Sequence, residues 1–400
     1  MRTLATFAGL ALVVATFFTI ALSAAPPERP VSAAPAAAET LQERLKRLPG
    51  DYRAWAELAT QYVDLARVTG DPSYYTRAEG ALGTAARLRA DDDAVLAGQA
   101  ALAAGRHEFA DAVRLAERAV AANPHSAAAH GVLADARTQL GDLRGAERAV
   151  ARMVDLRPGV AAFARASYAA ELRGDVGRAR RYLEYAHQDA WLPADLAYAR
   201  YYLGELALHS GDLDTARTWY AKALQAYPAH TPALAGQARA AALDGRLAEA
   251  LDLYEKVVER LPLPQYLVER GEVMVKAGRT PDWTLLKAQW ALSAGAGVRD
   301  DLTRAEFESD HGDPAAAVGH ARAELARTPG NLVANDAMAW ALYKAGEPAE
   351  ALPYARKATS TGWRHPLFAY HRATIERALG RPARIDPRFD PSLPALARFS

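Results

Sequence analysis

Hydrophobic and polar residues follow the period of amphipathic helices along most of the chain, in short segments separated by glycines. These glycines recur about every 34 residues, and a fixed period of this length indicates a repeated supersecondary unit. Each glycine is predicted to end the first helix of a helical hairpin at a positive φ, which other residues resist. The glycines at this spacing are Gly70, Gly105, Gly141, Gly174, Gly211, Gly245, Gly278, Gly312, Gly346 and Gly380.

Small residues flank the turn glycines at nearly constant distances. In one clear unit Gly204 precedes Gly211, and Ala216 follows it. We place these small residues where the two helices of a hairpin cross, because the backbones must approach closely there. Prolines such as Pro228 stop the second helix before the next unit begins. Since one hairpin cannot cover its own apolar face, about ten hairpins are predicted to stack over residues 51–388.

The two ends of the repeat array depart from the pattern. Residues 39–50 carry leucines at helical spacing and are predicted to form a capping helix. The last unit is cut short, because Pro387 comes too early for a second helix to be completed. Residues 389–400 form a tail, in which 392–399 are predicted to fold back onto the tenth unit with Phe399 as an anchor. A competing interpretation is that this open end pairs with another molecule.

The N-terminal segment has the character of an export signal. After Arg2 the chain is uncharged and apolar for long enough to cross a bilayer, so residues 1–25 are interpreted as a signal peptide or a signal anchor. Both alternatives put the rest of the chain outside the cytoplasm, in the extracellular space or the cell envelope. In the second, residues 3–25 would hold the protein at the plasma membrane. The Pro- and Ala-rich residues 26–38 are predicted to be a linker.

The repeat residues resemble those of a known family. The pattern Trp55-x-x-Leu58-Ala59-x-x-Tyr62 is similar to the tetratricopeptide repeat (TPR) signature, and so is the unit around Gly211. The resemblance covers roughly residues 51–380, and the chain is also similar to exported TPR proteins of high-GC bacteria. It implies an all-α, right-handed superhelical solenoid of about ten TPR-like hairpins, the last one truncated.

The composition of the chain argues against several classes of partner and site. The chain has 48 basic and 47 acidic residues, so its net charge favours no nucleic acid partner. It has no cysteine, which excludes disulfides, thiolate metal sites and cysteine nucleophiles.

No catalytic motif stands out in the sequence. The histidines lack the helical spacing of a metal pair, and neither a phosphate-binding glycine loop nor a nucleophile elbow occurs. We interpret the histidines as surface or turn residues, and Asp91, Asp92 and Asp93 as the start of a helix. We therefore expect no catalytic, cofactor or metal site, and no enzyme activity.

The resemblance implies a concave wall built from the first helix of each unit. In the family, certain positions of these helices point into the groove. In this chain the same positions carry aromatic residues and a surplus of acidic ones, which suit a basic or neutral peptide. The predicted groove residues are Asp135, Tyr168, Tyr201, Glu205, Arg239, Glu272, Glu306, Asp336, Trp340 and Tyr370.

Taken together, these patterns predict a non-catalytic scaffold or adaptor of the cell envelope that binds a protein or peptide. One alternative is an accessory factor of a transporter or secretion complex, held at the membrane by an uncleaved anchor. A second alternative is a hydrolase or metal-binding protein hidden in the repeats.

Overall fold

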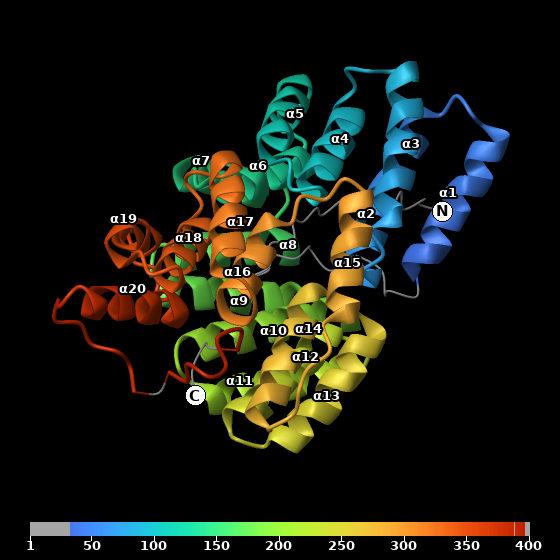
Figure 1. The fold of residues 1–400 in the computed structure, drawn as a ribbon. Helices are drawn as coiled ribbons and strands as arrows, with labels where there is room; N and C mark the ends of the chain where they lie inside the picture. The colour runs from blue at the N-terminus through green and yellow to red at the C-terminus, as the bar shows by residue number, and fades with distance from the viewer. Residues whose placement is uncertain (1–32, 388, 397–400) are drawn as a thin grey trace.

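The computed structural model of the chain describes residues 33–387 and 389–396. This described part folds into twenty α-helices and contains no β-strand (Figure 1). The helices are α1 (Ala33–Arg47), α2 (Tyr52–Thr69), α3 (Ser73–Leu88), α4 (Asp93–Gly105), α5 (Phe109–Ala122), α6 (Ala127–Leu140), α7 (Leu143–Leu156), α8 (Val160–Glu171), α9 (Val176–Asp189), α10 (Pro193–His209), α11 (Leu213–Ala226), α12 (Thr231–Leu243), α13 (Leu247–Arg260), α14 (Pro264–Lys276), α15 (Thr284–Gly295), α16 (Asp301–His311), α17 (Pro314–Arg327), α18 (Leu332–Lys344), α19 (Pro348–Ala358) and α20 (Pro366–Ala378).

The helices pair as the repeat pattern predicts. From α2 to α19 they form nine antiparallel hairpins, and α20 is the first helix of a tenth unit without a partner. The solenoid of about ten hairpins with a truncated last one is thus confirmed. The leading helix α1 begins at Ala33, inside the segment predicted to be a linker. Its alanines favour helix, and Pro35 is tolerated because it lies in the first turn.

Most of the turn glycines have the predicted backbone. Eight of the ten have positive φ, among them Gly141 at 80° and Gly211 at 81°. Gly105 instead ends α4, where it lies so close to the Tyr75 ring that a Cβ would be 2.7 Å from it. The other exception, Gly312, has a φ of −137°. At these two positions the prediction of a left-handed turn was wrong.

Small residues do mark the helix crossings. Ala216 is fully buried. Gly204 on α10 and Gly236 on α12 both face the Tyr220 ring of α11, where added Cβ atoms would approach within 2.6 and 2.7 Å. The ring therefore packs between two consecutive first helices, which need glycine at these points.

Units far apart in the sequence also touch, because the superhelix closes onto itself. Arg106 Nε donates to the carbonyl oxygen of Ala296 at 3.0 Å, and Asn331 Nδ2 donates to that of Gln139 at 2.9 Å. Gly141 and Gly330 approach so closely that a Cβ on Gly141 would collide with the Gly330 backbone. Figure 1 shows the result as the orange helices α15–α17 lying beside the blue and cyan α2–α6.

The C-terminal tail takes a different path from the one predicted. Phe389 stacks on Tyr370 of α20 with ring centroids 4.2 Å apart. Leu393 and Leu396, however, are completely buried against α12, α13 and α14, which belong to the sixth and seventh units. The tail therefore crosses the interior of the superhelix instead of covering unit ten, because apolar side chains between α12 and α14 offer deeper burial. Phe399 lies outside the described residues.

The predicted export segment, residues 1–25, also lies outside the described residues. Within the part of the chain that is described, no helix is both long and apolar enough to span a membrane.

Candidate binding site on the inner wall

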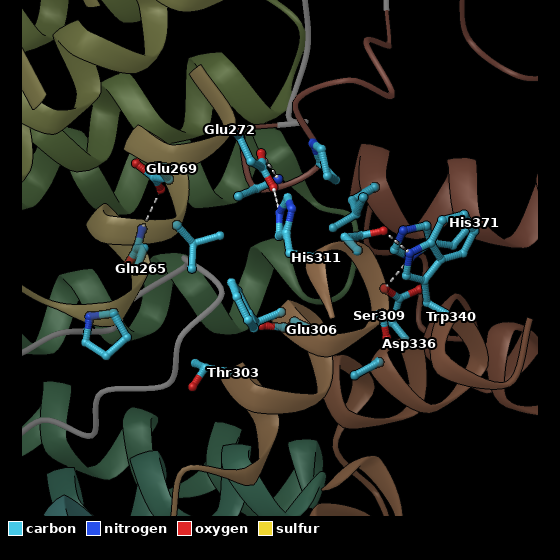
Figure 2. A pocket seen from close by; sticks show the side chains of 18 residues that line it. Gln265, Glu269, Glu272, Thr303, Glu306, Ser309, His311, Asp336, Trp340 and His371 are labelled. Atoms are coloured by element: carbon cyan, nitrogen blue, oxygen red, sulfur yellow. Dashed lines mark hydrogen bonds and ion pairs between the residues drawn. The ribbon is translucent and has the colours of Figure 1, made fainter. Parts of the chain in front are cut away.

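A pocket opens on the inner wall between the first helices of the last four units. Side chains of α14, α16, α18 and α20 line it (Figure 2). Pro394 and Ala395 of the tail also belong to its lining. Its apolar lining includes Val268 of α14 and Leu367 of α20. The site therefore combines four consecutive repeats with the end of the chain.

Glu272 of α14 stands where the tail meets the pocket. One carboxylate oxygen pairs with His311 Nε2 at 3.1 Å, and the other accepts the backbone N–H of Ala395 at 2.7 Å. Burial raises the pKa of Glu272 to about 7, against the effect of the hydrogen bond to His311. Burial alone would lower the pKa of His311, but its hydrogen bond to Glu272 and the charge of that carboxylate raise it overall. The pKa of the Glu272 carboxyl therefore lies near neutral pH, and that of His311 lies above its ordinary value.

The Trp283 ring holds His311 in place from behind. Its centroid lies 5.5 Å from that of His311 and 5.0 Å from that of Phe307. The ring covers Gly271 of α14, where any Cβ would collide with it. The seventh unit, which lacks the usual alanine after its turn, thus fills the space with an aromatic ring.

Trp340 and His371 form the opposite wall. Their rings stack with centroids 3.9 Å apart, and Trp340 Nε1 donates to Asp310 Oδ1 at 2.9 Å. His371 Nδ1 bonds Asp336 Oδ2 at 2.8 Å, so the carboxylate fixes the orientation of the imidazole. Figure 2 shows this group at the right-hand side of the pocket.

Two buried polar atoms in this wall have no partner. Asp336 is 3% exposed and His371 is 4% exposed, yet Asp336 Oδ1 and His371 Nε2 make no hydrogen bond to any described residue. Leaving such buried groups unsatisfied costs about 1–3 kcal/mol each. The Asp336–His371 pair therefore keeps one acceptor oxygen and one imidazole nitrogen whose hydrogen bonds are not made within the described residues.

The two hydroxyl-bearing residues of the pocket lining, Thr303 and Ser309, have hydrogen-bond partners within the protein. Ser309 Oγ donates to the carbonyl oxygen of Ala305 at 2.7 Å. The described residues include no group of three or more His, Asp or Glu side chains placed to hold a metal ion.

The structure brings four of the ten predicted groove residues together in this pocket, namely Glu272, Glu306, Asp336 and Trp340. Tyr370 lies outside it and stacks on Phe389. Whether these residues bind a partner stays a prediction.

The remaining five predicted residues do not line an open groove. Asp135 is fully paired with Arg165 at 2.7 and 2.9 Å, and Tyr168 packs edge-on against Trp363 of the α19–α20 link. Tyr201, Glu205 and Arg239 are buried among neighbouring units. The physical reason is that the tightly closed superhelix, together with ion pairs between adjacent units, covers this stretch of wall.

These ion pairs follow a rule that the sequence interpretation missed. An acidic residue on one first helix meets a basic residue on the next, as in Glu205–Arg239, Glu272–His311 and Asp336–His371. The partners are 34, 39 and 35 residues apart, which is about one repeat. His371 is thus a buried partner and not a surface or turn residue as predicted. An acidic residue and a basic residue or histidine about one repeat apart were the signal that could have found it.

The comparisons with known proteins agree with the repeat architecture. Family models described as tetratricopeptide repeat match residues 101–167 and 163–231. No curated protein matches the chain.

Solved structures with similar arrangements share little sequence with the chain. TTC0263, a thermophilic TPR protein of Thermus thermophilus, is 22% identical with a TM-score of 0.42, and the match covers 47% of this chain and 98% of that one. A human IFIT1 dimer with m7Gppp-AAAA is 14% identical with a TM-score of 0.46, over 82% and 86% of the two chains. YrrB, a TPR protein with an unusual peptide-binding site, is 16% identical with a TM-score of 0.32, over 49% and 97%.

The 34-residue hairpin period, the small residues at the crossings and the two family-model matches lead to one assignment. Residues 101–231 are a tetratricopeptide repeat region, and the hairpins on either side of them have the same two-helix architecture.

Proposed function

We propose that this protein is a non-catalytic scaffold or adaptor that binds a segment of a protein partner in the pocket between α14, α16, α18 and α20. The observation that carries the proposal is the unsatisfied pair Asp336 Oδ1 and His371 Nε2 beside the Trp340 ring. Paired polar groups next to an aromatic surface suit a peptide, which offers backbone N–H and C=O groups together with apolar side chains.

The charges around the pocket indicate which charge a bound segment should carry. Glu272, Glu306, Asp310 and Asp336 line it, whereas its basic groups are His311 and His371. Acidic residues favour a neutral or basic segment over an acidic one. The low conformational freedom of Trp340, which is held by Asp310 and stacked on His371, reduces the entropy lost on binding.

Capture of partners with matched tryptophan variants tests this proposal. Trp340→Ala removes the aromatic wall, whereas Trp191→Ala removes a tryptophan that is 83% exposed and is not part of the pocket lining. We expect partner proteins that crosslink to the wild type to crosslink also to Trp191→Ala but not to Trp340→Ala. Far-UV circular dichroism should show the same helicity for all three proteins. Equal capture by all three proteins would contradict binding at this pocket.

We also propose that the protein acts outside the cytoplasm, in the cell envelope or beyond it. The support is the uncharged apolar segment 3–25 behind Arg2. A fusion of residues 1–45 to a reporter that is active only outside the cytoplasm should give signal, and a stably made but silent fusion would overturn the proposal. Full-length protein in washed membranes would favour the membrane-anchored accessory factor, and a shortened soluble protein would favour the free scaffold.

A further inference from the structure

The tail contributes an edge of the pocket without belonging to the repeats. It follows α20 through a stretch without regular secondary structure that contains Pro382 and Pro387. Its last described residues then enter the inner wall and end at Leu396. The question is therefore whether the tail is a fixed part of the fold or an occupant of the site.

Beyond Phe389, three kinds of contact hold residues 390–396, and each is typical of a bound peptide. Leu393 and Leu396 insert completely between apolar side chains of α12, α13 and α14. Asp390 forms an ion pair with Lys276 at the end of α14. Between the two leucines, the backbone N–H of Ala395 donates to Glu272 Oε2 at 2.7 Å. Side-chain pockets combined with backbone capture are the means by which proteins recognise extended segments.

The residues between these anchors face outward. Pro391 and Ser392 are exposed, and Pro394 and Ala395 are partly exposed at the pocket edge. A short segment held by two leucines, one ion pair and one backbone hydrogen bond lies at the low end of local stability in a protein of this size. Release of this segment would lengthen the pocket along α14, from Glu272 to Lys276.

We infer that residues 390–396 are an internal ligand of the inner-wall site, and that a partner segment of the same chemistry competes with them. That chemistry is an uncharged stretch with two leucines three positions apart and a proline after the first, which suits the acidic pocket lining, preceded by one acidic residue that meets Lys276 outside that lining, as in Asp390-Pro-Ser-Leu-Pro-Ala-Leu396. The inference rests on the proposed binding function and adds both the kind of partner and a built-in competitor.

Thiol labelling of the full chain tests whether the tail docks and opens. The protein has no cysteine, so one introduced cysteine is its only thiol. Leu396→Cys places the thiol at a buried anchor, and Ser392→Cys places it at an exposed position of the same tail as the matched control. We expect alkylation of Leu396→Cys to be at least about tenfold slower, because the reagent must wait for the tail to open. Leu393→Cys, at the other anchor, should behave as Leu396→Cys does.

Competition by a synthetic peptide tests the second half of the inference. The probe is a peptide of residues 386–396, with a control peptide that carries Ser in place of both leucines. Because a tethered tail has an effective concentration on the order of millimolar, the peptides are added at that level. The native peptide should raise the alkylation rate of Leu396→Cys to within about threefold of the rate of Ser392→Cys. The control peptide should leave the alkylation rate of Leu396→Cys unchanged.

Equal labelling of Leu396→Cys and Ser392→Cys would overturn docking of the tail. Acceleration by both peptides, or by neither, would overturn the competition. These outcomes are distinct from failure of the proposed function, which is judged by capture with Trp340→Ala and does not require the tail to dock.

Discussion

The guanidinium of Arg239 lies between the carboxylates of Glu205 and Glu269, and no part of the side chain reaches solvent. The Tyr220 and Tyr254 hydroxyls donate to the two carboxylates at 2.5 and 2.9 Å. At the residue scale the inner wall is therefore a series of acid–base pairs that link consecutive first helices. Such pairs add little net stability when complete, but they are costly to break, because a buried charge is left alone.

Removal of Arg239 should demonstrate this cost. Arg239→Ala leaves two buried carboxylates without their cation and is expected to lower the free energy of unfolding by about 3–5 kcal/mol. Arg217→Ala removes an arginine from partly exposed ion pairs with Asp214 and Asp244 and should cost about 0–1 kcal/mol. Urea denaturation followed by circular dichroism measures both. Similar small losses in the two variants would contradict a buried charge network.

Glu272 predicts a dependence of stability on pH. Its pKa is raised from 4.5 to about 7, so its stabilising contribution is complete below pH 4.5 and is lost as the pH rises through about 7. The raised pKa of His311 acts in the same direction. Between pH 5 and pH 8 the wild type should lose on the order of 1–3 kcal/mol relative to Glu272→Gln, whose amide does not titrate.

Thermal unfolding of both proteins over this pH range measures the difference, and Glu255→Gln, at an exposed position, is the control that should follow the wild type. Parallel profiles for the wild type and Glu272→Gln would mean that the pocket carboxyl is not shifted.

Residue roles were only partly predictable from the sequence. Repeat position correctly gathered Glu272, Asp336 and Trp340 near one another, because equivalent positions of stacked units share a face. It could not show that Asp135 and Glu205 are covered. Their burial depends on a basic partner in a neighbouring unit and on the tightness of the superhelix, which no local pattern specifies.

At the scale of the helices and turns, the glycine of each hairpin has two separate functions. At Gly245, with φ of 77°, nothing lies within 4 Å of an added Cβ, so glycine is needed there for its backbone conformation alone. Gly141, with φ of 80°, also touches the backbone of Gly330 in the α17–α18 link. The period of 34 residues predicted the first function, whereas the second depends on a contact between distant units.

Alanine substitutions at these two glycines form a matched pair of variants. Gly245→Ala places a side chain at positive φ and should cost about 1–2 kcal/mol. Gly141→Ala has the same backbone strain and also forces Gly330 away, so it should cost at least about 1 kcal/mol more. Equal losses of stability on urea denaturation would show that the two turns of the superhelix do not touch at this point.

At the scale of the whole molecule, contacts between residues about 190 apart join the early and late units. Arg106 with Ala296 and Gln139 with Asn331 are examples. A solenoid whose units contact only their neighbours unfolds segment by segment, whereas these contacts couple its two halves. The candidate pocket lies on the inner wall of the last four units, with the tail in its lining. The sequence predicted the solenoid but neither this closure nor the path of Leu393 and Leu396, since both depend on the superhelix pitch.

A photocrosslinker placed on the inner wall tests the central claim most directly. Glu306 is a half-buried lining residue of the pocket, and Glu255 is exposed on α13, outside the pocket lining. With p-benzoylphenylalanine at position 306 or 255 of the full chain in living cells, we expect a discrete protein adduct from position 306. That adduct should be absent from position 255 and should disappear when Trp340→Ala is added. No adduct from position 306, or the same adduct from both positions, would contradict a partner site between α14, α16, α18 and α20.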